Sequence, residues 1–283
     1  MYLLFRYKRA IFTALLMLVF IPSRLTSAQT DEPDSTPAKE QPSSQEDTKA
    51  QSSVASSQKE FSFALGVGLI VSPRPYVGAK SRVFPIPSIE LEYKRWFFQG
   101  IRGGYSIVQS GRFSTNLYAQ ARFSGLELDS NPFLQGMEAR KKSMDAGFEL
   151  VYRGRPVGFR VNYLADVLGR SNGQEATILA TSGVPLGRFG IILAGIGPRW
   201  LSQNHVDYYY GVRETEVAPS RPAYSGKTTW NLDINITSII NLSSRWRLLA
   251  ILNREGFGSG IKDSPIVDEN SAYTFVTSLS YKF

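Results

Sequence analysis

Between residues 61 and 283 the chain alternates apolar and polar positions with a period of two. In 61–71 the odd positions are Phe, Leu or Val, and mostly small residues stand between them. The segments 112–123, 156–168 and 226–240 show the same alternation. Successive side chains of a β-strand point to opposite faces of the sheet, so the pattern predicts strands with one apolar face.

The alternation and the turn residues between segments predict eleven strands. Their expected bounds are 61–71, 86–94, 97–107, 112–123, 142–153, 156–168, 174–185, 188–200, 226–240, 245–256 and 273–283. Most have about 9 to 13 residues, longer than the usual strand of a soluble protein and suited to a tilted crossing of a bilayer. Aromatic residues also gather near the segment ends, as they do at the two interfaces of a membrane barrel.

We therefore expect an all-β fold, a transmembrane antiparallel up-and-down β-barrel of about 10–12 strands. A soluble β-sandwich has the same period and stays open as an alternative. Bacterial single-chain barrels usually have an even number of strands, so either one of the eleven is wrong or His205–Val212 adds a twelfth. The short links at 154–155, 186–187 and 241–244 are expected on one side, and the longer 124–141, 201–225 and 257–272 on the other.

Residues 1–28 have the pattern of a secretory signal peptide. Arg6, Lys8 and Arg9 precede an apolar stretch over 10–21, and small residues at 26–28 provide a cleavage site. A retained anchor helix is the alternative, but the apolar stretch is shorter than the roughly 20 residues that span a bilayer.

Residues 29–60 form a polar linker with one sizeable aliphatic residue, Val54. Seven acidic residues and three lysines give it a net charge of −4. Such a segment buries too little apolar surface to offset its ordering entropy, which predicts a disordered periplasmic linker before a barrel over 61–283. It is either a spacer or a tether for a cell-wall partner.

Composition narrows the chemistry. The chain has no cysteine, which removes disulfides and thiol chemistry, and its single histidine excludes a multi-histidine metal site. The mean hydropathy of −0.16 argues against helical membrane spans. Ser-His-Asp catalysis would need His205 as its base, but His205 is expected to be an ordinary loop residue. We expect no enzymatic activity and no cofactor.

Several charged or amide side chains fall on the polar phase of the predicted strands and are expected to line the lumen. They are Asp145, Glu149, Arg153, Arg160, Asp166, Asp233 and Asn235. Barrels of eight strands are filled by side chains and those of 16 are open, so at this size the lumen is either packed or a small-solute channel.

The barrel region is basic, with 25 Lys and Arg against 17 acidic residues. Export argues against nucleic acid as the partner, although basic surfaces can bind it. Lipopolysaccharide phosphates at the outer rim are more plausible anions. The candidate contacts are Arg74, Lys80, Arg82, Arg140, Lys141 and Lys142, and ordinary solvated loop charges remain the alternative.

Several short stretches, in this order along the chain, resemble the MipA/OmpV family of Gram-negative outer-membrane proteins. They are 75–78 (PYVG), 103–105 (GGY), 129–132 (DSNP), 209–212 (YYGV), 220–224 (SRPAY), 263–267 (DSPIV) and 279–283 (LSYKF). The linker 29–60 is longer than the family leads us to expect. The last stretch, with Leu279, Tyr281 and Phe283, is similar to the C-terminal signal read by the barrel assembly machinery.

The resemblance implies a location in the outer membrane, in contact with its lipid. It also implies a scaffold between a lytic transglycosylase and a peptidoglycan synthase, the role associated with the founding member. No residue motif for that role can be carried over to this chain. The alternatives are a narrow pore for small solutes and, less favoured, a hydrolase at the barrel rim that uses His205.

Overall fold

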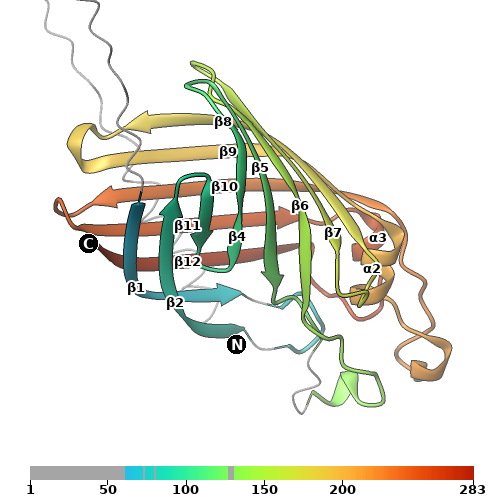
Figure 1. Cartoon of the computed structure of the whole chain (residues 1–283). Helices are drawn as coiled ribbons and strands as arrows, with labels where there is room; N and C mark the ends of the chain where they lie inside the picture. The colour runs from blue at the N-terminus through green and yellow to red at the C-terminus, as the bar shows by residue number, and fades with distance from the viewer. Residues whose placement is uncertain (1–60, 73, 80, 127–130) are drawn as a thin grey trace, which may run out of the picture. The chain divides into compact units, whose positions relative to one another are not determined.

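The computed structural model describes residues 61–72, 74–79, 81–126 and 131–283, so the signal peptide and linker expected over 1–28 and 29–60 lie outside the described residues. The described chain forms one antiparallel sheet of twelve strands that closes into a barrel in which β1 pairs with both β2 and β12 (Figure 1). The strands are β1 Phe61–Ser72, β2 Arg82–Tyr93, β3 Trp96–Gln99, β4 Arg102–Gln109, β5 Phe113–Arg122, β6 Ser143–Tyr152, β7 Gly158–Asp166, β8 Gln174–Pro185, β9 Gly190–Leu201, β10 Thr229–Asn241, β11 Trp246–Gly256 and β12 Ser271–Lys282. The barrel prediction is confirmed.

The two ends of the barrel differ in their connections. One, here called the turn end, carries the short links 94–95, 110–112, 153–157, 186–189 and 242–245. The other, the loop end, carries 73–81, 123–142, 167–173, 202–228 and 257–270. Twelve strands bring Phe61 and Phe283 to the same turn end. Figure 1 shows the C-terminus at the end opposite α2 (Gln203–Tyr210) and α3 (Ser259–Lys262).

The twelfth strand, which the sequence analysis did not find, comes from the segment 97–107. This segment was predicted as one strand and contains two, β3 and β4. Gly100 (φ +61°) makes a tight turn between β3 and β4, and glycine adopts this left-handed conformation at little cost. The alternative of a strand at His205–Val212 is wrong, because most of that segment belongs to α2. The Ser202 side chain caps this helix by accepting a hydrogen bond from the N–H of His205.

The barrel is apolar outside and polar inside. The outward Val67 and Leu117 are 72% and 50% exposed, whereas the inward Ser114, Glu149 and Thr177 are buried. A soluble sandwich buries its apolar faces between two sheets, but here a single sheet closes on itself and leaves its apolar face outward. The sandwich alternative is therefore wrong.

Aromatic residues lie at both edges of the outer face. Trp96 and Trp246 lie next to the turns of the turn end, and Trp200 and Trp230 are cross-strand partners near the loop end. Trp96 and Trp230 are about 60% exposed. Such rings occupy the two interfaces of a membrane barrel. None of the helices among the described residues is long and apolar enough to cross a bilayer.

The hydrophobic core lies in the loops of the loop end, which fold into a compact cap. The cap includes α2, α3 and the short 3₁₀ helices η1 (Pro132–Leu134) and η3 (Glu214–Glu216). The third 3₁₀ helix of the described residues, η2 (Gly187–Phe189), lies in a turn at the turn end. One buried cluster joins residues far apart in the chain: Tyr76, Leu126, Leu134, Met137, Val212 and Ile266. A second comprises Leu201, Val206, Phe257 and Ile261. The cap is thus held by apolar burial, in contrast to the polar lumen.

The wall has one weak seam, between β2 and β5. The strand β3 pairs with only four residues of β2, Glu90–Tyr93, so the Arg82–Ser88 part of β2 has no strand partner on that edge among the described residues. Alternate residues of a strand direct their backbone N–H groups to the same edge of the sheet. On this edge of β2, two of those positions are Pro85 and Pro87, which have no N–H group. The rings of Phe84 and Phe123 approach each other at this seam, with centroids 6.4 Å apart.

Candidate functional site

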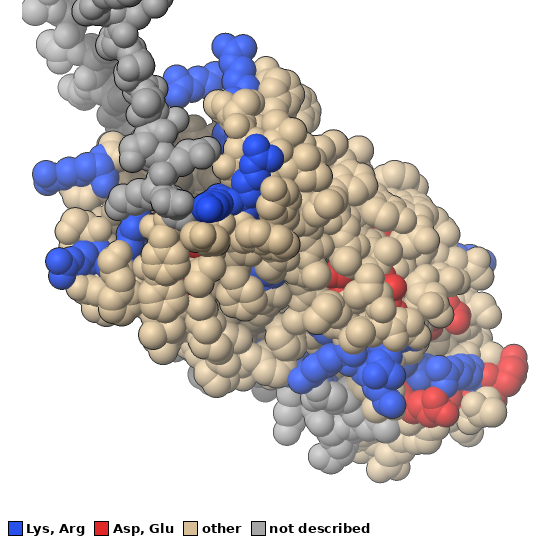
Figure 2. Space-filling model, in the orientation of Figure 1, with Lys and Arg blue, Asp and Glu red and all other residues tan. Residues whose placement is uncertain are grey.

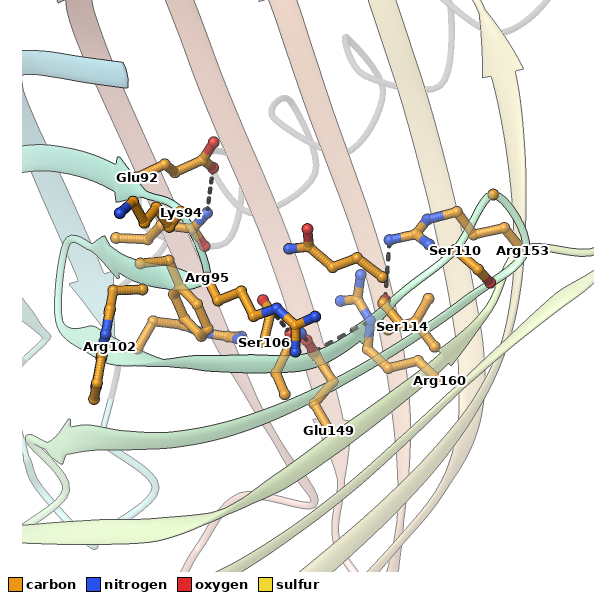
Figure 3. A pocket seen from close by; sticks show the side chains of 17 residues that line it. Glu92, Lys94, Arg95, Arg102, Ser106, Ser110, Ser114, Glu149, Arg153 and Arg160 are labelled. Atoms are coloured by element: carbon orange, nitrogen blue, oxygen red, sulfur yellow. Dashed lines mark hydrogen bonds and ion pairs between the residues drawn. The ribbon is translucent and has the colours of Figure 1, made fainter. Parts of the chain in front are cut away.

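The turn end opens into a cavity of about 1180 Å³ inside the barrel, here called the vestibule. Its wall is made by β2 to β7 and the turns between them, and it is mostly polar (Figure 3). The charged side chains that line it are Glu92, Lys94, Arg95, Arg102, Glu149, Arg153 and Arg160.

Glu149 is the centre of the polar contacts in the vestibule. Its Oε1 accepts hydrogen bonds from Arg102 at 3.2 Å and from the Asn116 amide at 3.1 Å. Its Oε2 lies 3.7 Å from Nε of Arg160. The Arg102 guanidinium also stacks 4.3 Å from the ring centroid of Tyr118, a favourable cation–π position. These contacts fix Arg102 and Glu149 while Arg160 stays 41% exposed to the cavity.

Two further arginines of the vestibule make only neutral contacts among the described residues. Arg95 donates to the carbonyl of Ile107 at 3.1 Å, and Arg153 donates to the hydroxyl of Ser114 at 3.0 Å. Neither guanidinium is paired with a carboxylate of the residues that the structure describes. Four arginines therefore face two glutamates, and the wall is positively charged before Lys94 is added.

Nearer the loop end, a belt of ion pairs runs around the lumen. We call it the ion-pair belt, and its members are Arg122, Asp145, Glu175, Arg199, Asp233 and Glu255. Glu175 accepts hydrogen bonds from both arginines, at 2.8 Å and 2.9 Å. No side chain of the belt is more than 18% exposed, so the opposite charges stabilise one another where water does not screen them.

The belt is joined directly to the cap. Asn231 donates to Glu255 at 2.5 Å and accepts a hydrogen bond from the N–H of Gly258 at 2.8 Å. Asp233 contributes less, since its ion pair with Arg199 is 3.8 Å long. Cap, belt and vestibule thus follow one another from the loop end to the turn end.

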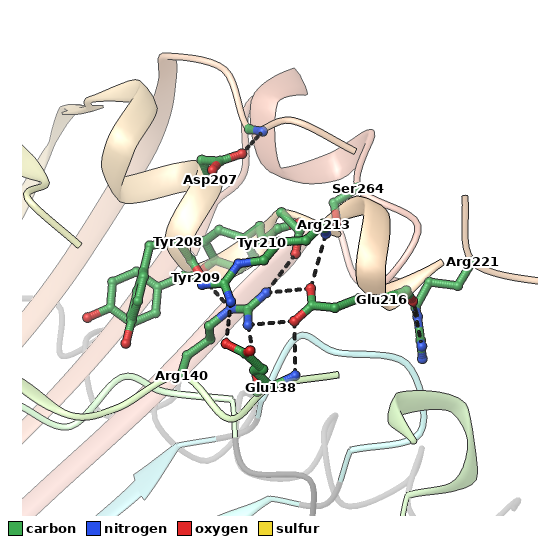
Figure 4. Close-up of polar contacts among 12 residues, drawn as sticks. Glu138, Arg140, Asp207, Tyr208, Tyr209, Tyr210, Arg213, Glu216, Arg221 and Ser264 are labelled. Carbon is green, nitrogen blue, oxygen red and sulfur yellow. Dashed lines mark hydrogen bonds and ion pairs between the residues drawn. The ribbon is translucent and has the colours of Figure 1, made fainter. Parts of the chain in front are cut away.

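Within the cap, a buried ion pair joins Arg140 to Glu216 (Figure 4). Two nitrogens of the guanidinium donate to the two carboxylate oxygens, each at 2.8 Å. The carboxylate also accepts the N–H groups of Glu138 and Arg213. Burial would raise the pKa of Glu216, but the hydrogen bonds from Arg140 and the two N–H groups outweigh it and lower the pKa to about 2.

His205, predicted to be in a loop, instead lies in α2 and is 6% exposed. Its ring is 4.9 Å from that of Tyr209. Burial, together with the charge of Arg122, lowers the pKa of His205 to about 3, so the imidazole is neutral at pH 7.

The structure distributes the seven predicted lumen residues over four places. Asp145 and Asp233 belong to the ion-pair belt, and Glu149, Arg153 and Arg160 line the vestibule. Asp166 instead orders the 167–173 loop, whose N–H groups at 168, 171 and 172 donate to its carboxylate. Asn235 accepts a hydrogen bond from Thr237, two residues along β10.

Sequence reasoning missed four residues of the belt and four charged residues of the vestibule. They are Arg122, Glu175, Arg199 and Glu255 in the belt, and Glu92, Lys94, Arg95 and Arg102 in the vestibule. The four belt residues stand on the inward phase of predicted strands, so this signal was present in the sequence. What the sequence lacked was the register that brings neighbouring strands together.

Among the rim cations, Arg140 is 3% exposed and engaged with Glu216, so its assignment as a lipopolysaccharide contact is wrong. Lys142 lies 5.7 Å from the ring centroid of Phe84, beside the seam, whereas Lys80 lies outside the described residues. At the turn end Leu279 and Tyr281 belong to β12, and the ring of Phe283 lies 5.0 Å from that of Tyr281. Their role as an assembly signal stays a prediction.

Comparison with known proteins identifies the family. The model described as "MltA-interacting protein MipA" matches residues 65–283. The chain belongs to the MipA family. Within it, the chain is 27% identical over 232 residues to the MltA-interacting protein of Escherichia coli K12, a match covering 79% of this chain and 91% of the relative.

Other MipA-family relatives are named for their location. The putative outer membrane protein YiaT of Escherichia coli K12 is 27% identical over 227 residues (78% and 90% of the two chains). Outer membrane protein OmpV of Vibrio cholerae is 24% identical over 156 residues (55% and 60%). The barrel of this MipA-family protein thus resides in the outer membrane. Because the short turns of such barrels face the periplasm, the turn end is periplasmic.

Among solved structures, outer-membrane-expressed OmpT of Vibrio cholerae covers 79% of this chain and 97% of its own, at 10% identity. The TM-score of 0.36 is too low to carry information about function.

Proposed function

We propose that this protein is a non-enzymatic outer-membrane scaffold that docks peptidoglycan-remodelling enzymes at its periplasmic end. The observation that carries the proposal is the charge of that end. Each of its five turns contains an arginine and none contains an acidic residue. We call these side chains the basic collar: Arg95, Arg112, Arg153, Arg155, Arg188 and Arg245.

Figure 2 supports this arrangement. On the face that it shows, basic side chains gather at the end where Figure 1 places the turns, whereas the opposite end carries both basic and acidic side chains. A ring of one charge sign guides a partner of the opposite sign and orients it. The name of the E. coli relative, MltA-interacting protein, points to a lytic transglycosylase as one such partner.

The interior favours a scaffold over a narrow pore. A through-channel would have to pass the ion-pair belt and then the apolar clusters of the cap, both of which are closely packed. A rim hydrolase is also disfavoured, since its only candidate base, His205, is buried against Tyr209.

Affinity purification from detergent-solubilised envelopes tests the docking. The wild-type protein should recover a lytic transglycosylase at low salt and lose it at about 0.5 M salt, where charges are screened. The combined variant Arg112→Gln, Arg155→Gln, Arg188→Gln removes collar charge outside the vestibule and should recover much less. Lys141→Gln, at the loop end, is the control. Equal recovery by the collar variant and wild type would refute the collar as a docking surface.

Single-channel recording in planar bilayers tests the pore. The folded protein should show no steady conductance, because the belt and the cap stay closed. Steady conductance of wild-type protein, free of contaminating porins, would favour the pore instead.

A further inference from the structure

The vestibule is not accounted for by docking on the basic collar. Arg95 and Arg153 belong to both the collar and the vestibule. Arg102 and Arg160, however, lie on β4 and β7 and line the space inside the barrel, away from the turns (Figure 3). A purely structural lumen would give each arginine a carboxylate partner, as the ion-pair belt does. The vestibule instead keeps an excess of arginine around an open volume.

The excess charge is held ready for an anion. Glu149 is already occupied by Arg102 and Asn116, and the Arg160 side chain remains 41% exposed beside it. Arg95 and Arg153 lack a carboxylate partner among the described residues. A concave wall of one charge sign focuses the field inside and concentrates ions of the opposite sign.

The neutral part of the wall indicates the kind of anion. Amide and hydroxyl groups alternate with the arginines, contributed by Gln99, Ser106, Gln109, Ser110, Ser114 and Asn116. Such groups bind ligands that carry many hydroxyl and amide groups. The inward part of the wall offers Val151 and Phe97 as its apolar side chains, which is too little for a lipid tail.

We propose that the vestibule binds a carboxylate-bearing amino-sugar glycan fragment that enters from the periplasm. Guanidinium groups recognise carboxylates through paired hydrogen bonds, and the amides and hydroxyls take the sugar. The volume of about 1180 Å³ slightly exceeds the roughly 300–1,000 Å³ of common ligand pockets, which accommodates a short, hydrated fragment rather than a polymer. The proposal requires the outer-membrane location but not the docking of a partner protein.

Calorimetric titration of the full folded protein in detergent tests the site with three soluble probes. The first is a disaccharide–tetrapeptide released from peptidoglycan, which carries carboxylates; the second is uncharged N,N′-diacetylchitobiose; the third is tetraglutamate, which carries carboxylates without sugar. The first should bind, weakening as salt rises, and the other two at least about tenfold more weakly. Equal binding of chitobiose would overturn the role of charge, and equal binding of tetraglutamate that of the sugar.

Variants locate the site. Arg153→Gln with Arg160→Gln should weaken binding of the disaccharide–tetrapeptide by about tenfold or more, because each removes a charge-assisted hydrogen bond. Arg112→Gln, at the same end but outside the vestibule, should not. If the double variant fails to fold, Arg153→Gln alone replaces it, since within the described part of the chain the Arg153 guanidinium donates to the neutral hydroxyl of Ser114 and forms no ion pair. Unchanged binding in a folded variant would overturn the proposal.

A lipid source of the anion is tested by competition. Protein in nanodiscs containing phosphatidylglycerol should bind the disaccharide–tetrapeptide as well as protein in phosphatidylcholine nanodiscs. Loss of binding only in phosphatidylglycerol would show that the vestibule takes a lipid headgroup and would overturn the glycan proposal. The collar variant Arg112→Gln, Arg155→Gln, Arg188→Gln should keep glycan binding even where it loses the partner protein, which separates the two proposals.

Discussion

Replacing Glu216 by glutamine should open the cap while leaving the barrel intact. The change removes the charge that pairs with Arg140 and leaves a guanidinium that is 3% exposed without its carboxylate. Breaking a buried ion pair on one side costs about 3–5 kcal/mol. Arg140 keeps the carbonyls of Tyr208, Glu138 and Gly211 as acceptors, which places the expected cost near the lower value.

The lowered pKa of Glu216, which arises from the same contacts, gives the same magnitude. It is lowered from 4.5 to about 2 in the folded protein. Each pKa unit corresponds to about 1.4 kcal/mol, so the charged carboxylate stabilises the cap by about 3 kcal/mol relative to an unfolded one. The local opening constant should therefore rise by about two orders of magnitude in the variant.

Hydrogen exchange followed by mass spectrometry, on protein in nanodiscs, measures that opening. Peptides with the N–H groups of Glu138 and Arg213, which donate to Glu216, should exchange about a hundredfold faster in Glu216→Gln. Strand peptides from β8 to β11 should be unchanged. Glu214→Gln is the matched control, an exposed acid two residues away in the same turn.

Two results would refute this reasoning. If the cap peptides of Glu216→Gln exchange at wild-type rates, the ion pair does not hold the cap. If strand peptides exchange faster to the same extent, cap and barrel open as one unit.

Three further predictions concern the belt, the histidine and the seam. Glu175→Gln should lower stability to urea by about 3–5 kcal/mol, because two buried arginines lose their shared carboxylate, whereas Asp233→Asn, with one long ion pair, should cost under about 1 kcal/mol. In the folded protein the pKa of His205 is about 3, below its usual 6.5, so the unfolded state binds the proton first. The stability of the cap should therefore fall as the pH is lowered from about 6.5 to 3. In His205→Gln the acid-induced opening of the cap should begin only at about pH 4.5, where the carboxylates begin to titrate. Alanine at Pro85 and Pro87 should cost under about 1 kcal/mol, since no hydrogen bond is lost, but should increase oligomers on native gels by adding free donors at an edge. If the proline variants form no more oligomers on native gels than the wild-type protein, the last prediction is contradicted. If His205→Gln opens at the same pH as the wild-type protein, the second is contradicted.

The alternation of residues predicted most strands because the phase of a strand is a local property. It failed at 97–107, where Gly100 turns the chain inside an otherwise alternating stretch, and at β2, whose prolines hid its beginning. In both places the deciding feature is a backbone conformation or a missing donor rather than a side-chain pattern.

The site was predicted only in part, for a different reason. Asp145, Glu149 and Arg160 could be assigned to the polar phase from the sequence alone. The ion pairs that these and other inward residues form could not be assigned from the sequence. Arg122 and Glu175, for example, are 53 residues apart and meet through the register of the four strands β5 to β8. The cap was not foreseen either, because Tyr76 and Ile266 come together only through contacts between distant loops.

The seam has a consequence for how the ring of strands closes and opens. The β1–β2 pairing joins twelve residue pairs, but β2–β3 and β3–β4 join four each, so parting the sheet at the β2–β3 junction breaks about a third as many residue pairs as parting it at β1–β2. During insertion into the membrane, this junction is therefore expected to zip last, and under mechanical load to part first. Because Pro85 and Pro87 have no N–H to offer, the parted edge of β2 is a poor template for a strand of another chain. The ring thus has a preferred breaking point from which it re-forms with its own strand.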